Sequence, residues 1–378
     1  MYAIRPSAAW IWGDGGCRGY AQMVARYPEI PGLVNDTVRE EGIAGHWVAH
    51  KIGQGFIVPE GTEAPNSVEV DDKMLDGALM YVNDIRTRSC GHPAYMETPL
   101  PAPWIHEHCG GTPDAWSWNP LTRTLTVWDY KYGFRYVEAF ENPQLSIYVS
   151  AILDYLHKVG AIVLDGHSEQ DISVDIVIVQ PRSYGADIVR NWKAKAAMLR
   201  PIWNRLRAAA IEAAGPDPQL RAGPHCLDCS ARAHCPAAIR ASLVALDVTS
   251  RSVPVDLAPE AAGDLLRRLI AAQDAVNTMV TGLQQQMVHA ISQGHQDPNW
   301  TMGNGRSSTI YVEGGEAQIL ALAKVMGVDI TKPVRAKTPL QVLELMDPRL
   351  VNRFITKTPG ARKLVPFTER SLRKALSQ

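Results

Sequence analysis

The sequence carries almost no net charge and contains no long apolar run. With 38 Lys and Arg residues against 39 Asp and Glu residues, the 378-residue chain has a formal net charge of −1. Any affinity for nucleic acid must therefore come from local basic patches and bound metal. No segment approaches the roughly 18 consecutive apolar residues of a membrane-spanning helix, and the N-terminus lacks the apolar stretch of a secretion signal. We expect a cytoplasmic protein with no membrane partner.

Cysteine is also scarce, and one common nucleotide-binding motif is missing. Six cysteines without a secretion signal do not indicate a disulfide scaffold. The absence of a G-x-G-x-x-G fingerprint argues against a nucleotide-dependent oxidoreductase. The apolar content of 46% is enough for a hydrophobic core. The chain is thus expected to be globular, with one large domain or two medium ones.

A segment rich in β-branched and aromatic residues holds the first candidate site. Residues 114–118 and 124–130 flank turn residues at 119–123, which predicts a β-hairpin. Because side chains alternate along a strand, Asp129 and Lys131 emerge on one face, and strand pairing can bring Asp114 beside them. Mg²⁺ or Mn²⁺ would relieve the repulsion between the two carboxylates and leave room for water and a phosphate oxygen. An ordinary surface ion pair is the alternative for an isolated Asp-x-Lys pattern.

Three motifs in order along the chain match one enzyme superfamily. Pro113-Asp114 followed by Asp129-Tyr130-Lys131 resembles the PD-(D/E)XK signature of nucleases. Gln144 and Tyr148 are similar to the Q-x-x-x-Y motif of its RecB-like branch, on one face of a helix. Residues 41–46, Glu-Gly-Ile-Ala-Gly-His, resemble the first-helix motif of that branch, whose histidine binds metal.

The resemblance implies a fold, an activity and site residues. The fold would be α/β, a restriction-endonuclease-like core with helices flanking a central mixed sheet, over residues 1–245. The activity would be metal-dependent DNA hydrolysis, by an exonuclease acting on single-stranded or duplex ends in recombination, repair or phage DNA metabolism. The implied catalytic residues are Asp114, Asp129, Lys131, Gln144 and Tyr148, and the implied metal ligands are His46, Asp114, Asp129 and Tyr130.

Further expectations follow from the same resemblance. An acidic residue on a strand before the PD motif joins the metal site in some family members, and Glu107 is the nearest candidate. The expected setting is a bacterial or phage-infected cell, with DNA and a helicase or single-strand annealing protein as partners. A DNA-binding module that retains the nuclease fold without catalysis is the alternative. The intact set of Asp114, Asp129 and Lys131 argues against that alternative, because binding alone does not need it.

The cysteines are spaced as ligands. Cys226, Cys229 and Cys235 form a C-x₂-C-x₅-C pattern, and Cys17 lies more than 200 residues earlier, after glycines that interrupt the helix predicted over residues 1–30. This distribution resembles the [4Fe–4S] nucleases of the RecB-like branch, in which one N-terminal cysteine joins three C-terminal ones. The resemblance implies that these four thiolates hold such a cluster. Zinc is the alternative, with His225 or His234 completing the site.

Hydrophobic periodicity predicts the remaining elements of the first domain. Helices are expected over residues 38–52, 68–88 and 149–159, and a buried strand over residues 172–179. Residues 182–207 carry seven basic side chains against one acid, interleaved with Tyr184, Trp192 and Trp203. This combination suits stacking against a single DNA strand. A helix with its tryptophans in the core is the alternative.

Residues 246–378 are expected to form a mostly helical accessory domain. A long helix is predicted over residues 260–293, two short strands within 301–312, and helices over 316–326 and 339–347. From residue 331 to the end there are eleven Lys and Arg residues and three acids. Such a tail can contact DNA phosphates or dock on the nuclease domain.

Overall fold

The protein is organised as two compact units. The computed structural model describes residues 4–13, 15–28, 37–164, 168–183, 187–249, 258–312, 314–328, 330, 348–351 and 354–366. The units are Met1–Gly282 and Leu283–Gln378. The boundary between them along the sequence falls within the long helix α9 (Pro259–Ser292), whereas the boundary expected at residue 245 falls within α8 (Pro236–Thr249).

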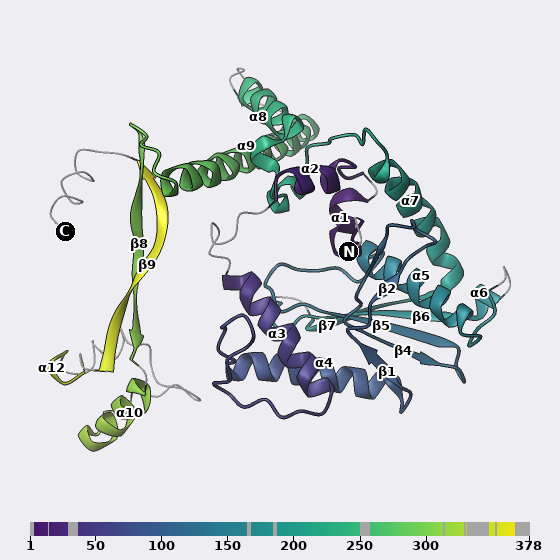
Figure 1. The fold of residues 1–378 in the computed structure, drawn as a ribbon, viewed down its shortest axis with the longest axis horizontal. Helices are drawn as coiled ribbons and strands as arrows, with labels where there is room; N and C mark the ends of the chain where they lie inside the picture. Colours follow the sequence, from purple (N-terminus) through teal and green to yellow (C-terminus); the bar gives the residue numbers. More distant parts are fainter. Residues whose placement is uncertain are drawn as a thin grey trace. The chain divides into compact units, whose positions relative to one another are not determined.

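The first unit is built on a five-stranded mixed sheet flanked by helices (Figure 1). The strand order is β1-β4-β5-β6-β7. Only β5 and β6 run parallel, and each other neighbouring pair is antiparallel. The strands are β1 (Ala94–Met96), β4 (Ala115–Asn119), β5 (Thr124–Tyr130), β6 (Ser173–Val179) and β7 (Val189–Lys195). The predicted α/β class is confirmed.

The predicted hairpin is confirmed as the β4–β5 pair. Ala115 lies opposite Trp128 in the antiparallel register. The Asn119 side chain closes the turn by accepting hydrogen bonds from the Leu121 and Thr122 amides at 3.0 and 3.1 Å. A helix connects β5 to the parallel strand β6, because two parallel neighbours need a long crossover connection.

Helices α3 (Thr37–Gly53) and α4 (Asp72–Ser89) pack on one face of the sheet and confirm two predicted helices. The Asp71 carboxylate caps α4 by accepting a 2.8 Å hydrogen bond from the Met74 amide. Trp128 of β5 is fully buried in this layer, and its indole N–H donates to Asp84 of α4 at 2.7 Å. This bond joins the helix to the sheet.

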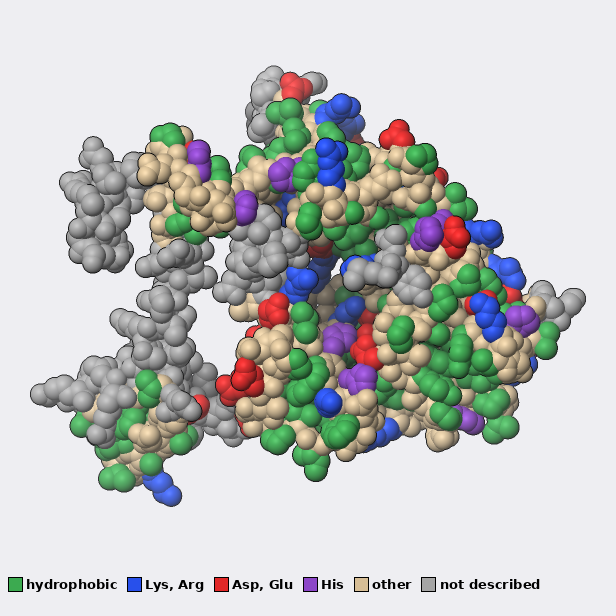
Figure 2. Space-filling view, in the orientation of Figure 1, with side chains coloured by type: hydrophobic (Ala, Val, Ile, Leu, Met, Phe, Trp, Pro, Cys, Tyr) green, Lys and Arg blue, Asp and Glu red, His purple; other side chains and the backbone are tan. Residues whose placement is uncertain are grey.

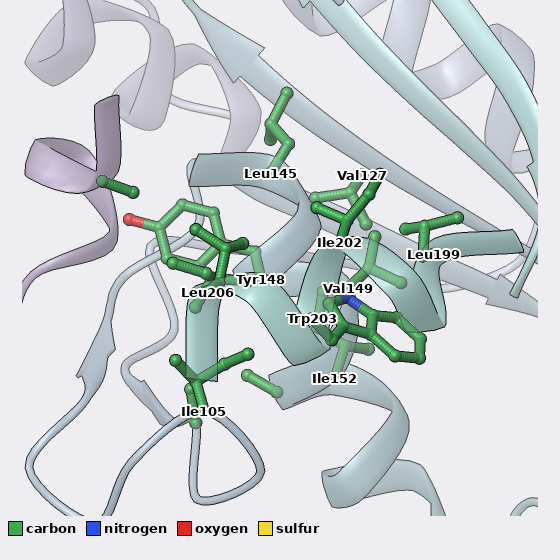
Figure 3. Packing of buried hydrophobic residues seen from close by; sticks show 14 of the residues in the cluster. Ile105, Val127, Leu145, Tyr148, Val149, Ile152, Leu199, Ile202, Trp203 and Leu206 are labelled. Carbon is green, nitrogen blue, oxygen red and sulfur yellow. The ribbon is translucent and has the colours of Figure 1, made fainter. Parts of the chain in front are cut away.

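Helices α5 (Pro143–Lys158) and α7 (Ala196–Ala214) cover the opposite face. Figure 3 shows the apolar side chains of both helices packed together with Val127 of β5. Trp203 is buried and donates its indole N–H to the Ser146 carbonyl at 2.7 Å. Trp203 therefore belongs to the core and cannot stack on DNA bases. The basic segment also contains the strand β7, which its composition did not reveal, and Tyr184 lies outside the described residues.

Short elements surround this core. The N-terminal segment forms a 3₁₀ turn at Pro6–Ala8 and the helices α1 (Ala9–Trp12) and α2 (Tyr20–Arg26). The chain turns tightly between the two helices, since a Cβ at Gly16 would lie 2.1 Å from the Ile11 carbonyl oxygen. The other short elements are β2 (Leu100–Pro101), β3 (Gly110–Gly111), α6 (Ser168–Asp171) and two 3₁₀ turns at Pro224–Asp228 and Arg232–His234.

The second unit combines a two-stranded ribbon with short helices. Strands β8 (Trp300–Tyr311) and β9 (Ile355–Pro366) pair antiparallel, so the region around residues 301–312 forms one long strand and not two. Its small core joins α10 (Gly315–Met326) to α12 (Pro348–Val351) and consists of Ile319, Ala323, Ile330, Val351 and Phe354. The helix predicted over residues 339–347 lies outside the described residues. None of the helices described for the chain combines the length and apolarity needed to cross a bilayer.

Candidate active site

The strand pairing brings the predicted carboxylates together where β5 ends. Ala115 lies opposite Trp128, so Asp114 and Asp129 occupy the next facing positions. Asp129 shares the α5 side of β5 with Val127, whereas Trp128 and Tyr130 face α4. The Asp114 Oδ2 atom accepts a 2.7 Å hydrogen bond from the Tyr130 amide, which fixes one of its oxygens.

The buried Asp129 carboxylate has one occupied oxygen and one unsatisfied oxygen. Its side chain is only 2% exposed, and Lys131 Nζ lies 2.9 Å from Oδ1. Gln144 at the start of α5 also donates to Oδ1, at 3.1 Å. The second oxygen, Oδ2, has no hydrogen-bond partner. A buried carboxylate oxygen without a partner lowers the stability of the fold. Such an oxygen is a suitable ligand for a divalent cation.

His46 on α3 and Glu97 after β1 extend the carboxylate group. His46 Nδ1 lies 3.7 Å from Asp114 Oδ1 and 3.9 Å from Glu97 Oε1. One ligand atom from each of the three residues lies within 4.8 Å of the others, which is close enough to share a cation. Gly45 allows α3 to approach this closely, because a Cβ there would lie 3.0 Å from the Tyr132 ring.

Glu97 occupies the place that sequence reasoning assigned to Glu107. The Glu107 side chain is 80% exposed and lies near His108, so that assignment is wrong. Glu97 instead follows β1, which pairs with β4 so that Met96 faces Ala115 and Glu97 reaches Asp114. Its backbone has φ of +49°, and its amide donates to the Asp114 carbonyl at 3.2 Å. Only the pairing of β1 with β4 identifies Glu97 as a site residue. The separation of Glu97 from Asp114 in the sequence does not indicate that pairing.

The electrostatics of the site favour bound positive charge. Burial raises the pKa of Asp129 to about 6, although Lys131 opposes the shift. Burial also raises the pKa of Asp114, against the opposing charges of His46 and Lys131. Burial disfavours the charged form of His46, but Asp114 and Glu97 outweigh it and raise the pKa of the imidazole. The site therefore contains three carboxylates but only one lysine and one histidine. A divalent cation would neutralise the remaining negative charge.

Tyr130 and Tyr148, the remaining predicted residues, occupy different positions relative to the carboxylates. The Tyr130 phenol is buried on the α4 side and packs against the rings of Tyr81 and His46, with centroids at 4.9 and 5.4 Å. The Tyr130 side chain therefore points away from Asp129, and a contribution to a metal would come from its main chain. Tyr148 is 4% exposed and lies beside Gln144 on α5, in the wall of the cavity described next.

Two cavities of about 440 and 450 Å³ meet at the site and share His46, Asp114 and Lys131. Figure 2 shows histidine, acidic and basic side chains gathered around a hollow on the visible face of the first unit. Arg5, Thr112, Gln144 and Tyr148 are among the residues that line the first cavity, and Arg39, Ile43, Glu97 and Gly133 are among those that line the second. An extended chain can therefore reach the carboxylates from two sides.

For a phosphodiester substrate, the class that the sequence resemblance implies, Tyr148→Phe is expected to lower cleavage without lowering the melting temperature. Burial raises the pKa of the Tyr148 phenol, so the hydroxyl stays protonated and can donate to a substrate phosphate. Loss of one such hydrogen bond is worth about 3- to 10-fold in rate. Cleavage assays and thermal melts would be compared with Tyr155→Phe, a matched change at the other end of α5. A lower melting temperature with unchanged cleavage would make Tyr148 a structural residue only.

The four predicted cysteines lie close enough for their charges to interact. Cys17, Cys226 and Cys235 are buried and Cys229 is partly buried. The Cys229 thiol is electrostatically coupled to the other three, although Cys17 is more than 200 residues away in sequence. Burial raises the pKa of Cys229 to about 11, so the metal-free thiol is protonated. Backbone N–H groups also point at these sulfurs, such as that of Gly223, which donates to Cys226 Sγ at 3.4 Å.

The thiol spacing bears on which metal would fit. Tetrahedral zinc with bonds of about 2.3 Å would hold its sulfurs about 3.8 Å apart. Within the described part of the chain, no three of these sulfurs and nearby histidine nitrogens lie within 4.8 Å of one another. No preformed three-ligand zinc site is therefore described among these residues. His234 is stacked on Tyr27 at 4.4 Å, which gives that imidazole a packing role.

Comparison with known proteins identifies one family. The model of a family described as "Protein of unknown function (DUF2800)" matches residues 59–371. The match includes Asp114, Asp129, Lys131 and the three C-terminal cysteines, and it begins after His46 and Cys17. No curated protein matches the chain.

Proposed function

Since this chain belongs to the DUF2800 family of proteins of unknown function, we propose its activity from the site itself: a divalent-metal-dependent nuclease that hydrolyses DNA phosphodiester bonds. The observation that carries the proposal is the buried Asp129, with Lys131 and Gln144 on one oxygen and no partner on the other. A structural ion pair would not need a second carboxylate and a histidine beside it. The expected substrate is a DNA end.

Each residue of the site has a distinct proposed role. Asp114, His46 and Glu97 lie close enough to share a Mg²⁺ or Mn²⁺ ion, and Asp129 is the proposed fourth ligand. The ion would supply a more acidic water and neutralise charge on the scissile phosphate. Lys131 is placed by Asp129 and stabilises the negative charge that develops on the phosphate oxygens. Gln144 holds the Asp129 carboxylate in one orientation from α5.

Cleavage of labelled DNA tests this proposal directly. Purified protein would be incubated with end-labelled linear DNA and closed-circular DNA in Mg²⁺, Mn²⁺ or EDTA. We expect metal-dependent loss of the linear substrate and persistence of the circle, as for an enzyme that acts on ends. Binding of DNA without cleavage in either metal would instead support a non-catalytic DNA-binding module. A helicase or single-strand annealing protein remains the proposed partner class.

Metal binding should depend on pH in a direction set by Asp129. Its pKa of about 6 means that a proton occupies the carboxylate below pH 6 and must leave before a cation binds. The increase in melting temperature caused by Mn²⁺ should therefore be small at pH 5 and grow through pH 6 to 7.5. Asp129→Asn should show a small increase at every pH. An equal Mn²⁺ effect at pH 5 and 7.5 in the unmodified protein would contradict this assignment.

We further propose that Cys17, Cys226, Cys229 and Cys235 hold a [4Fe–4S] cluster. Support comes from the electrostatic interaction of Cys229 with the other three thiols and from the N–H groups directed at the sulfurs. Packing already holds the two segments together, since Arg18 pairs with Glu212 at 2.8 Å and the Ser230 hydroxyl donates to the Tyr27 carbonyl at 3.1 Å. The cluster would be structural, because hydrolysis transfers no electrons.

A further inference from the structure

The connection between β5 and α5, residues 131–142, exposes three large aromatic side chains next to the site. We call this segment the aromatic loop. Phe134, Tyr136 and Phe140 are 42%, 51% and 58% exposed. The loop begins at Lys131, so the Cα atom of Phe134 lies within about 11 Å of that of Lys131. Three exposed aromatic rings on one short segment indicate a binding surface.

The aromatic loop has no regular secondary structure, but its main chain is fixed by two side chains from the sheet. Gln180, fully buried after β6, donates to the carbonyls of Gly133 and Arg135, both at 2.8 Å. Arg190 of β7 donates to the Val137 carbonyl at 2.8 Å. A loop held in this way presents its rings with little loss of entropy when a ligand binds.

Arginines lie against the exposed rings. The Arg182 guanidinium carbon is 4.8 Å from the centroid of the Phe134 ring, and that of Arg190 is 4.6 Å from the centroid of the Tyr136 ring. Phe140 lies edge-on to Trp192 of β7 at 5.2 Å. Arg182 also pairs with Glu41, and Arg190 donates to the Val137 carbonyl, so the exposed rings are the feature that matches a single nucleic-acid strand, whose unpaired bases stack on aromatic side chains.

We propose that the aromatic loop binds single-stranded DNA by base stacking and directs its backbone to Asp129 and Lys131. This inference rests on the nuclease activity proposed above and adds its substrate class. The second cavity reaches the start of the loop, because Gly133 lines it together with Asp114 and His46. A duplex keeps its bases stacked on each other, so their faces are not available to the rings. The loop therefore selects single-stranded ends or overhangs.

Binding without metal tests the proposal separately from catalysis. Full-length protein in EDTA would be titrated with a fluorescein-labelled oligothymidylate and with a blunt duplex of equal length. Phe134→Ala, Tyr136→Ala and Phe140→Ala should each weaken binding of the single strand by about 5- to 150-fold, the value of one lost stacking contact. Binding of the duplex should change less than about twofold. Tyr136→Phe keeps the ring and should bind as the unmodified protein does.

Two control variants remove exposed apolar surface elsewhere. Leu121→Ala changes an 86% exposed side chain in the β4–β5 turn, and Tyr155→Ala changes a 39% exposed ring near the end of α5. Both should bind the single strand normally. The proposal is overturned if the three alanine variants of the loop bind it as tightly as the controls, or if binding of the duplex weakens equally.

The outcomes also separate this inference from the nuclease activity. Metal-dependent cleavage by a protein that binds single strands and duplexes equally would keep the nuclease and overturn the role of the aromatic loop. Selective binding of single strands that depends on these rings, with no cleavage in Mg²⁺ or Mn²⁺, would keep the loop and overturn the nuclease. Failure to bind any DNA in EDTA, together with no cleavage in Mg²⁺ or Mn²⁺, would overturn both and leave the rings as a contact for a protein.

Discussion

Asp129→Ala is expected to abolish metal-dependent DNA cleavage, with a loss on the order of 10³-fold or more, while the protein remains folded. The substitution removes Oδ2, which has no hydrogen-bond partner and is proposed to bind the cation. It also removes Oδ1, which positions Lys131. Asp114→Ala and Lys131→Ala should fail similarly, and His46→Ala less completely, because three carboxylates would remain. End-labelled DNA in Mg²⁺ and Mn²⁺ gives the readout.

Asp154→Ala is a matched control for Asp129→Ala. Asp154 is also largely buried and pairs with a lysine, Lys158, at 2.7 Å, but it lies near the end of α5, away from the site. We expect Asp154→Ala to retain cleavage. Metal-dependent DNA cleavage by the Asp129→Ala protein would contradict the assignment of this site.

The stability of the metal-free protein provides an independent check on Asp129. The folded-state pKa is raised from 3.8 to about 6, so ionisation of this carboxylate destabilises the fold as pH rises through that interval. Asp129→Asn removes that ionisation and should melt at the same or a higher temperature than the unmodified protein at pH 7.5 in EDTA. Unfolding of Asp129→Asn under these conditions would show that the carboxylate is needed for structure.

Cys17→Ser is expected to cause the largest loss of stability. A cluster that joins Cys17 to Cys226 closes a loop of more than 200 residues. By analogy with a disulfide, such a closure is worth about 5 kcal/mol, a large share of the stability of an ordinary domain. Anaerobically purified protein should be brown with broad absorbance near ~400 nm. The Cys17→Ser protein should lose that absorbance and aggregate or unfold.

Two other cysteines serve as controls for Cys17. Cys90 is exposed, and Cys90→Ser should leave colour and melting temperature unchanged. Cys109 is buried outside the thiol group, so Cys109→Ala tests whether loss of any buried thiol has the same effect. Colourless protein with one equivalent of zinc and no iron would replace the cluster by zinc. Equal tolerance of Cys17→Ser and Cys90→Ser would remove Cys17 from the site.

Local patterns determined much of this protein. Alternation along one strand places Asp129 and Lys131 on the same side, and turn residues at 119–123 specify the hairpin that brings Asp114 opposite. Helical periodicity located α3, α4 and α9 to within a few residues. These features depend on interactions between residues that are near in sequence, or on the fixed geometry of a tight hairpin, so the amino-acid order is sufficient to predict them.

The tertiary structure decided the features that depend on distant partners. Glu97 joins the site only because β1 pairs with β4, whereas nearness to Asp114 in the sequence favoured Glu107. Trp203 is buried because α7 packs on α5, which the basic residues around it did not reveal. The aromatic loop is fixed by Gln180, which follows β6, and by Arg190 of β7, and both come later in the chain. Pairing and packing between distant segments set which side chains are buried and which meet, and no local pattern encodes that choice.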